Sequence, residues 1–244
     1  FEQFMESFRL ARATGFNNIN VDLMSAIPGQ TEMSLNNTFD KVTALQPEHI
    51  SVYSLILEDG TYLADNIDKF PPVPDEDEDR CMYHITKERL YSAGYERYEI
   101  SNYSRPGFEC RHNLLYWNRE EYYGFGCSAA GLIGNVRYSD IRDVNKYIEL
   151  NGDIGKIHEN IEILTKEDEM EEFMFLGLRK TAGVDMNDFR NRFGMPIEKV
   201  YEKEIKSNID KGLLTRQADM LKLSEYGIDI CNTVMSDFIL TDGD

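Results

Sequence analysis

The first half of the chain alternates helix-like and strand-like patterns of apolar residues. Apolar positions spaced as on one face of a helix run over residues 1–14, and Ile19–Met24 follows as a short apolar run. A second amphipathic helix is indicated over residues 31–46, and His49–Leu57 has the composition of the next strand. This order is typical of βα units in a mainly parallel sheet, and it predicts an α/β fold.

Two further segments complete this half. The acidic run at residues 75–79 follows a proline-rich connection and predicts the first turn of a helix, where the helix dipole favours carboxylates. Tyr95–Ile100 alternates like a third strand. Residues 101–135 are too dense in Tyr, Trp, Asn and Gly for a regular element, so we expect a long loop that carries function.

After residue 156 the pattern changes to charged helices, which indicates a second domain. These helices are expected over residues 166–180, 185–193 and 196–210. A two-stranded wing that includes residues 220–223 and a closing helix over residues 224–239 follow. We therefore expect residues 157–244 to form a small winged-helix-like α+β domain behind a first domain of residues 1–156.

Composition narrows the function classes. The chain has 26 Lys and Arg against 44 Asp and Glu, a formal charge of -18, which repels phosphate backbones and argues against nucleic-acid binding. It has no apolar run of about 20 residues and no leader pattern, so we expect a cytoplasmic protein that meets membranes only through partners. Because it starts at Phe1, inside a helical pattern, we expect a segment of a longer protein.

Asp22 is the candidate binding residue of the first half. It interrupts an apolar strand close to the expected carboxyl end of that strand. In parallel α/β folds ligands collect at this end, where a carboxylate commonly binds a ribose hydroxyl or an amine. The alternative is structural, with Asp22 capping a turn or pairing with a buried arginine. The residues alone leave both interpretations open.

The densest constellation is His112-Asn113 followed by Tyr116-Trp117. A histidine beside an amide, with large aromatic side chains four and five residues later, suits ligation of iron while the rings sandwich a flat conjugated ligand. A hydrogen-bonded loop histidine packed by aromatic residues is the more ordinary interpretation, and residue spacing alone favours it.

Two other groups of residues give weaker indications of a binding site. Glycines at 124, 126 and 131 flank Cys127–Ala130, where the backbone either approaches a ligand or packs closely against its own fold. Cys81 and His84 have ligand-like spacing, but they lie on a predicted helix whose apolar side needs such residues. Spacing assembles no Ser/His/Asp set, so we assign no catalytic residue.

Four blocks of sequence together carry a family resemblance. They are Asn20–Thr31, Tyr98–Tyr103, His112–Trp117 and Tyr122–Gly126, and residues 170–179 extend the match toward the carboxyl end. They resemble the oxygen-independent coproporphyrinogen oxidase family of radical-SAM proteins, on its HemW branch. The resemblance covers essentially the whole chain, and its last block looks like the start of the carboxy-terminal domain of the family.

The resemblance implies a partial TIM-like radical-SAM barrel, of which this chain supplies the later strands. S-adenosylmethionine would lie across the carboxyl ends of those strands. Asp22 matches a family carboxylate that contacts this ligand, while Ile56 and Ala130 match positions that contact it mainly through backbone groups. His112 matches the histidine of a HNxxYW motif associated with heme binding, which makes it the expected ligand of heme iron. In that motif Asn113, Tyr116 and Trp117 would orient the histidine and pack the macrocycle.

The chain departs from the family on its amino-terminal side, where the earlier barrel strands and their ligand contacts are absent. The CxxxCxxC segment that holds a [4Fe-4S] cluster is absent, and the four cysteines at 81, 110, 127 and 231 are scattered. The ligands of the cluster are therefore not in this chain, and we expect it to have no radical activity alone.

Three functional hypotheses follow. The first is a heme chaperone that passes heme to a recipient hemoprotein. The second is an enzyme, an oxygen-independent coproporphyrinogen III oxidase that converts coproporphyrinogen III to protoporphyrinogen IX. The third is a carboxy-terminal module that serves only interaction or packing. Because an incomplete barrel leaves a sheet edge and an apolar face uncovered, we also expect self-association, a homodimer being the simplest form.

Overall fold

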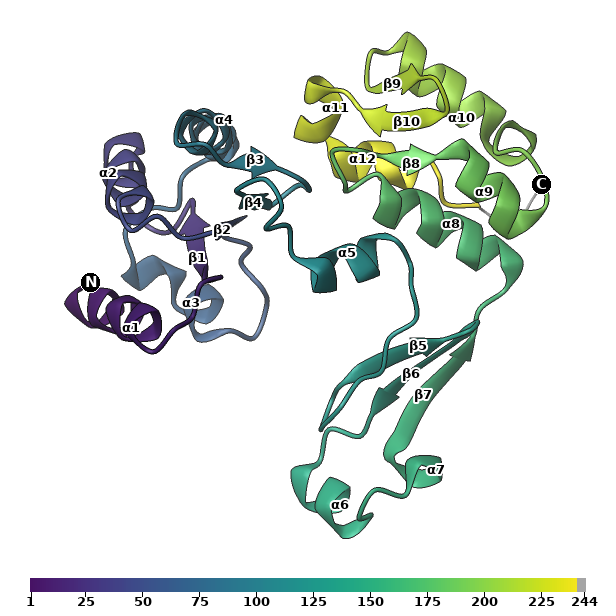
Figure 1. Ribbon diagram of the computed structural model, residues 1–244, viewed down its shortest axis with the longest axis horizontal. Helices are drawn as coiled ribbons and strands as arrows, with labels where there is room; N and C mark the ends of the chain where they lie inside the picture. The colour runs from purple at the N-terminus through teal and green to yellow at the C-terminus, as the bar shows by residue number, and fades with distance from the viewer. Residues whose placement is uncertain (241–244) are drawn as a thin grey trace. The chain divides into compact units, whose positions relative to one another are not determined.

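The computed structural model describes residues 1–240 and divides the chain into two compact units, residues 1–110 and the residues from Arg111 onward (Figure 1). The domain boundary expected from the sequence lies later, after residue 156. Residues 111–156 cluster with the second unit. Within the described residues, no helix has the length and apolar character needed to cross a membrane.

The first unit is a four-stranded sheet with helices. Its elements are α1 (Glu2–Ala13), β1 (Asn20–Ser25), α2 (Glu32–Thr43), β2 (His49–Ser54), α3 (Tyr62–Asp65), η1 (Ile67–Lys69), α4 (Glu76–Ser92), β3 (Glu96–Arg97) and β4 (Asn102–Ser104). The strand order is β1-β2-β4-β3. Strands β1 and β2 are parallel, as expected, but β4 runs antiparallel to both of its neighbours, β2 and β3.

The third strand predicted over residues 95–100 is present but shorter than expected. Strand β3 covers Glu96–Arg97, and the chain then turns back into β4. The buried carboxylate of Glu99 lies at this turn, where it accepts a hydrogen bond from the Ser101 amide at 3.1 Å and another from the Asn102 side chain. A buried acid that satisfies local donors in this way favours a turn over a continued strand.

Local caps fix the helix starts that the sequence indicates. The Thr31 hydroxyl accepts from the Ser34 amide at the start of α2, and the Ser34 side chain accepts from the Thr31 amide. Asp75 and Glu78 form the same reciprocal pair at the start of α4. These capping boxes satisfy amide groups that the helix leaves without partners. The acidic run therefore serves the first turn of α4, as predicted.

The core of the first unit lies between one face of the sheet and its helices. Buried apolar side chains come from the sheet at Val21, Ile50 and Val52, and from α2 and α4 at Leu35, Phe39, Val42, Met82 and Leu90. In β1 the side chains that alternate with Val21 point to the opposite face. Asn20 and Asp22 are exposed there, so this second face of the sheet is left for polar residues.

The second unit begins with α5 (Arg111–Trp117) and an antiparallel sheet. This sheet contains β5 (Ala130–Ile133), β6 (Val136–Asp140) and β7 (His158–Ile163) in the order β5-β6-β7, with α6 (Val144–Glu149) and α7 (Ile154–Ile157) between β6 and β7. The expectation of a long segment without regular structure over residues 101–135 is therefore wrong, since β4, α5 and β5 all fall within it.

The rest of the second unit is helical with a small sheet. It contains α8 (Lys166–Gly177), β8 (Val184–Asp185), α9 (Met186–Phe193), α10 (Glu198–Asp210), β9 (Leu214–Gln217), β10 (Met220–Leu223), α11 (Glu225–Asp229) and α12 (Cys231–Ser236). The sheet has three antiparallel strands in the order β8-β10-β9, one more than predicted. The closing helix is interrupted at Ile230, whose φ of -122° and ψ of 35° are not helical. Phe173, Phe189, Phe193, Tyr201 and Phe238 are buried here and contact one another through their rings.

Candidate functional site

Asp22 lies on the polar face of the first sheet. It is the third residue of β1, in the middle of the strand and not at its carboxyl end as expected, and its side chain is exposed. The register places Asp22 opposite Ser51, and Asn20 opposite His49. Because cross-strand partners share a face, these four side chains gather on the same side of the sheet.

A chain of hydrogen bonds ends on the Asp22 carboxylate. The Asn20 amide nitrogen Nδ2 donates to Asp22 Oδ1 at 2.7 Å, and Asn20 Oδ1 lies 2.7 Å from His49 Nδ1. His49 Nε2 lies 2.8 Å from the Tyr98 hydroxyl. The Ser51 hydroxyl donates to Asn20 Oδ1 at 3.3 Å. Asp22 is therefore held by an amide and not by the buried arginine that the structural alternative proposed.

His49 is the buried member of this chain, with 4% of its surface exposed. Burial lowers the pKa of His49 below 6.5, although the negative charge of Asp22 opposes that shift. The ring is therefore neutral near pH 7. Since Asn20 Oδ1 can only accept, the Nδ1 atom carries the proton and Nε2 accepts from the Tyr98 hydroxyl.

The other two residues matched to the S-adenosylmethionine site are also exposed. Ile56 follows the end of β2 and is 77% exposed, next to Leu55, whose amide donates to the Ser25 carbonyl at 2.9 Å. Ala130 opens β5 in the second unit. Backbone packs tightly beside it, because a Cβ atom on Gly124 would lie 2.3 Å from the Ala130 carbonyl oxygen. Close packing of the chain on itself thus explains the glycine at 124.

The heme-associated motif lies on α5. His112 is exposed in its first turn, and Tyr116 follows one turn later on the same face, with ring centroids 4.8 Å apart and planes at 84°. Tyr122 extends the aromatic row, 4.6 Å from Tyr116. Within the described part of the chain, no protein group hydrogen-bonds to the ring nitrogens of His112. Both nitrogens are therefore open to a ligand.

Trp117 has a different environment from His112. The Arg179 guanidinium lies 4.5 Å from the centre of its ring. Trp117 and Asn118 also line a small cavity of about 130 Å³ with Phe173 and Lys180. The structure brings His112 and Tyr116 together, whereas the Trp117 ring packs toward α8 and the segment that follows it.

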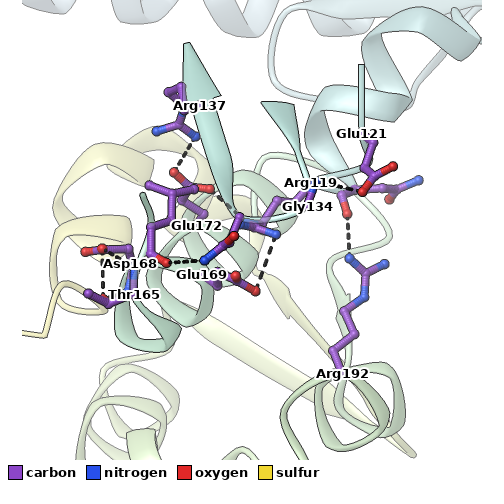
Figure 2. Close-up of polar contacts among 12 residues, drawn as sticks. Arg119, Glu121, Gly134, Arg137, Thr165, Asp168, Glu169, Glu172 and Arg192 are labelled. Carbon is purple, nitrogen blue, oxygen red and sulfur yellow. Dashed lines mark hydrogen bonds and ion pairs between the residues drawn. The ribbon is translucent and has the colours of Figure 1, made fainter. Parts of the chain in front are cut away.

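The residues just after α5 anchor it through buried charges, which the sequence reasoning did not find. Glu172 of α8 is 8% exposed, and its carboxylate accepts hydrogen bonds from both Arg119, at 2.8 Å, and Arg137 of β6 (Figure 2). Arg119 also lies 3.7 Å from Glu169, and Arg192 donates to the Asn118 carbonyl at 3.0 Å. Burial of Arg137 opposes ionisation, but the Glu172 carboxylate more than compensates and raises the pKa of Arg137. No signal in the sequence pairs these distant residues.

The described residues contain no group of three or more His, Cys, Asp or Glu side chains that could hold a metal ion. The ligand-like spacing of Cys81 and His84 therefore does not correspond to such a group. Heme iron needs only one axial nitrogen from the protein, which the exposed His112 can supply. A [4Fe-4S] cluster needs several thiolates, and the described cysteines do not provide them.

Part of the second unit matches a known family model. Residues 164–230 match the HemN C-terminal domain. This match covers α8 through α11, including Glu172, and it begins just before the capping residue Thr165 of α8.

Curated relatives match nearly the whole chain. Heme chaperone HemW of Lactococcus lactis is 36% identical over 241 residues, which is 98% of this chain and 63% of the relative. Heme chaperone HemW of Bacillus subtilis is 37% identical over 96% of this chain and 62% of the relative. The chain thus spans about three fifths of the length of these relatives. Their similarity confirms the family resemblance inferred from the four sequence blocks.

A solved structure gives the fold. The radical SAM enzyme coproporphyrinogen III oxidase, HemN, from Escherichia coli superimposes with a TM-score of 0.80 over 98% of this chain and 59% of that chain. The two sequences are 18% identical, so the likeness establishes a shared mixed α/β fold.

Proposed function

Because the chain is related in sequence to the HemW branch of the oxygen-independent coproporphyrinogen oxidase family, we propose that the protein is a heme chaperone of the HemW type. It binds heme and passes it to a recipient hemoprotein. The observation that carries the proposal is His112, an exposed histidine on α5 whose ring nitrogens have no protein partner among the described residues and whose ring rests against Tyr116.

The geometry of α5 suits a transferable cargo. A single imidazole nitrogen supplies one bond to heme iron, and the nearly perpendicular Tyr116 ring limits how the imidazole can turn. An exposed site of this kind leaves the other face of the macrocycle open to a recipient. In this proposal Tyr116 packs the porphyrin edge, Asn113 orients the histidine, and Trp117 supports α5 through its contact with Arg179.

The test is a titration of hemin into the full-length protein, followed at the Soret band. We expect His112→Ala to bind at least tenfold more weakly, a loss of about 1.4 kcal/mol or more. His84→Ala is the matched control, since His84 is also an exposed helical histidine, on α4. Equal affinity and identical spectra in the wild type and His112→Ala would show that this histidine does not bind the iron.

S-adenosylmethionine is the second proposed ligand. Its site includes the side chain of Asp22 and backbone groups of Ile56 and Ala130. The exposed Asp22 carboxylate fits it, because Oδ2 remains open to an ammonium or a ribose hydroxyl while Oδ1 is held by Asn20. When bound beside a [4Fe-4S] cluster, this ligand supplies radical chemistry. The described cysteines do not fit such a cluster, so we assign no step of that chemistry to this chain.

The finer architecture is proposed in the same terms. We interpret the parallel pair β1 and β2 as later strands of a TIM-like barrel within residues 1–156. We interpret the described part of residues 157–244 as a winged-helix-like domain, in which β8, β9 and β10 make the wing, while residues 241–244 lie outside the described residues. Localisation to the cytoplasm and formation of a homodimer complete the proposal.

The fold likeness to a coproporphyrinogen III oxidase favours a second candidate, the oxygen-independent oxidation of coproporphyrinogen III to protoporphyrinogen IX. Anaerobic incubation of the reconstituted full-length protein with coproporphyrinogen III separates the two functions. Formation of the divinyl product would support the enzyme, and its clean absence together with His112-dependent heme binding would support the chaperone.

A further inference from the structure

The hydrogen bonds behind Asp22 all point in one direction. The Tyr98 hydroxyl donates to His49, His49 Nδ1–H donates to Asn20, and the Asn20 amide donates to Asp22 Oδ1. His49 and Asn20 each donate on the side toward the carboxylate and accept on the side away from it. If the Asn20 amide were turned over, its oxygen would face the Asp22 carboxylate, and two acceptors form no hydrogen bond, so Asp22 fixes the orientation of the amide.

The residues of this hydrogen-bond chain range from buried to exposed. His49 and Ser51 are buried, Tyr98 is half-buried, and Asn20 and Asp22 are exposed. An exposed aspartate alone samples several rotamers, and a ligand must then restrict it at an entropic cost. Asn20 is bound at both ends, by His49 and Ser51 behind it and by Asp22 in front, and it therefore restricts the carboxylate in advance.

We propose that Asn20 and His49 are positioning residues, which hold the Asp22 carboxylate in one orientation for a nucleoside ligand. The inference rests on the proposed function, because it assumes that Asp22 contacts S-adenosylmethionine. It adds that Oδ1 is committed to Asn20, so that Oδ2 is the atom presented to the ligand. His49 acts at a distance, by fixing Asn20, and does not touch the ligand.

The binding test uses S-adenosylhomocysteine, which is not cleaved, titrated calorimetrically into the anaerobically reconstituted full-length protein. We expect Asn20→Ala to bind roughly tenfold more weakly, as expected for the loss of one hydrogen bond to a charged group. Asn18→Ala is the matched control, since it removes another exposed asparagine of the same segment. We expect the control to bind as the wild type does.

Because His49 is buried, its replacement can also disturb the fold, and two variants are needed to separate the two effects. His49→Leu removes the donor and should weaken binding about as much as Asn20→Ala. His49→Asn keeps a donor near the place of Nδ1 and should restore most of the affinity. Loss in the first with rescue in the second separates a positioning role from simple damage to the fold, because asparagine fills the site no better than leucine does.

The tautomer of His49, measured by NMR, tests the hydrogen-bond chain without any ligand. In protein labelled with ¹⁵N-histidine, we expect His49 at pH 7 to be neutral with its proton on Nδ1, which is the minor tautomer of free histidine. Tyr98→Phe removes the partner of Nε2 and should allow the other tautomer to appear. A wild-type ring protonated on Nε2 alone would overturn the inference, because Nδ1 would then have no proton to donate to Asn20.

The binding outcomes separate the inference from its premise. If Asp22→Asn weakens binding while Asn20→Ala and His49→Leu do not, the positioning roles are wrong and the Asp22 site stands. If Asp22→Asn binds as the wild type does, the ligand does not meet this carboxylate, and the site and the inference both fail. Weaker binding in Asp22→Asn, Asn20→Ala and His49→Leu, with rescue by His49→Asn, supports the inference.

Discussion

Glu172 offers the sharpest test of the energetics of the second unit. It is a carboxylate with 8% of its surface exposed, held between Arg119 and Arg137. Removing one partner from a buried ion pair leaves a desolvated charge and typically costs about 3–5 kcal/mol. Arg137 is 35% exposed and keeps Glu162 at 3.7 Å, so it can recover solvent and a partner. Arg119 also keeps a second carboxylate, Glu169 at 3.7 Å, but its side chain is only 9% exposed and cannot recover solvent, so the cost falls mainly on Arg119.

We expect Glu172→Met to lower the free energy of unfolding of the second unit by about 3 kcal/mol, at the lower end of that range. Glu172→Gln keeps an acceptor for Arg119 and should cost about half as much. The control is Glu162→Gln, whose side chain is 59% exposed, and a surface ion pair of this kind contributes about 0–1 kcal/mol.

Urea unfolding provides the measurement. Trp117 is the single tryptophan of the chain and belongs to the second unit, so its fluorescence reports that unit specifically. The double variant Arg119→Met/Glu172→Met completes a mutant cycle. We expect it to be more stable than the sum of the single variants predicts, because it removes the buried Arg119 charge together with the closest partner of that charge. A loss below 1 kcal/mol for Glu172→Met, or strict additivity in the cycle, would refute the assignment of Glu172 as a buried, desolvated partner.

Two further predictions concern packing and pH. Gly124→Ala places a methyl group against the Ala130 carbonyl and should destabilise the second unit by about 1–3 kcal/mol in the same urea assay, whereas Gly155→Ala, which meets its nearest neighbour only at 3.5 Å, should be near neutral. His49 has a folded-state pKa below 6.5, so the unfolded state binds its proton first and stability should fall as the pH drops below about 6.5. His49→Asn should flatten this part of the stability profile measured by urea unfolding, and an unchanged slope would show that His49 is not the group responsible.

Sequence reasoning succeeded where the determining contacts are local. The caps at Thr31 and Asp75 each involve a partner three residues away, so the sequence shows both members at once. It failed at α5, a short helix of seven residues whose aromatic composition resembles that of a loop. Sequence reasoning also extended the third strand through Glu99, where the structure has a turn. The burial of the Glu99 carboxylate, which favours this turn, depends on the folded sheet.

The same distinction between local and distant contacts applies to the candidate sites. Asp22 and His112 are recognisable as residue types in a pattern, but the groups that hold them come from elsewhere in the chain. His49 is 29 residues from Asn20 and depends on the parallel register of β1 and β2. Glu172 is 53 residues from Arg119. Single-sequence patterns carry no register between strands and no pairing between distant charges, so these supports appear only in the structure.

The anchoring of α5 bears on the third functional hypothesis, which concerns the carboxy-terminal module. That hypothesis gives the carboxy-terminal module a role in interaction or packing only. Yet Arg179 covers the Trp117 ring, Arg192 binds the Asn118 carbonyl, and Glu172 binds Arg119, so three residues of this module hold the helix that carries His112. Packing by these residues decides where the histidine is presented, and a packing role for the module therefore supports the proposed heme site and does not compete with it.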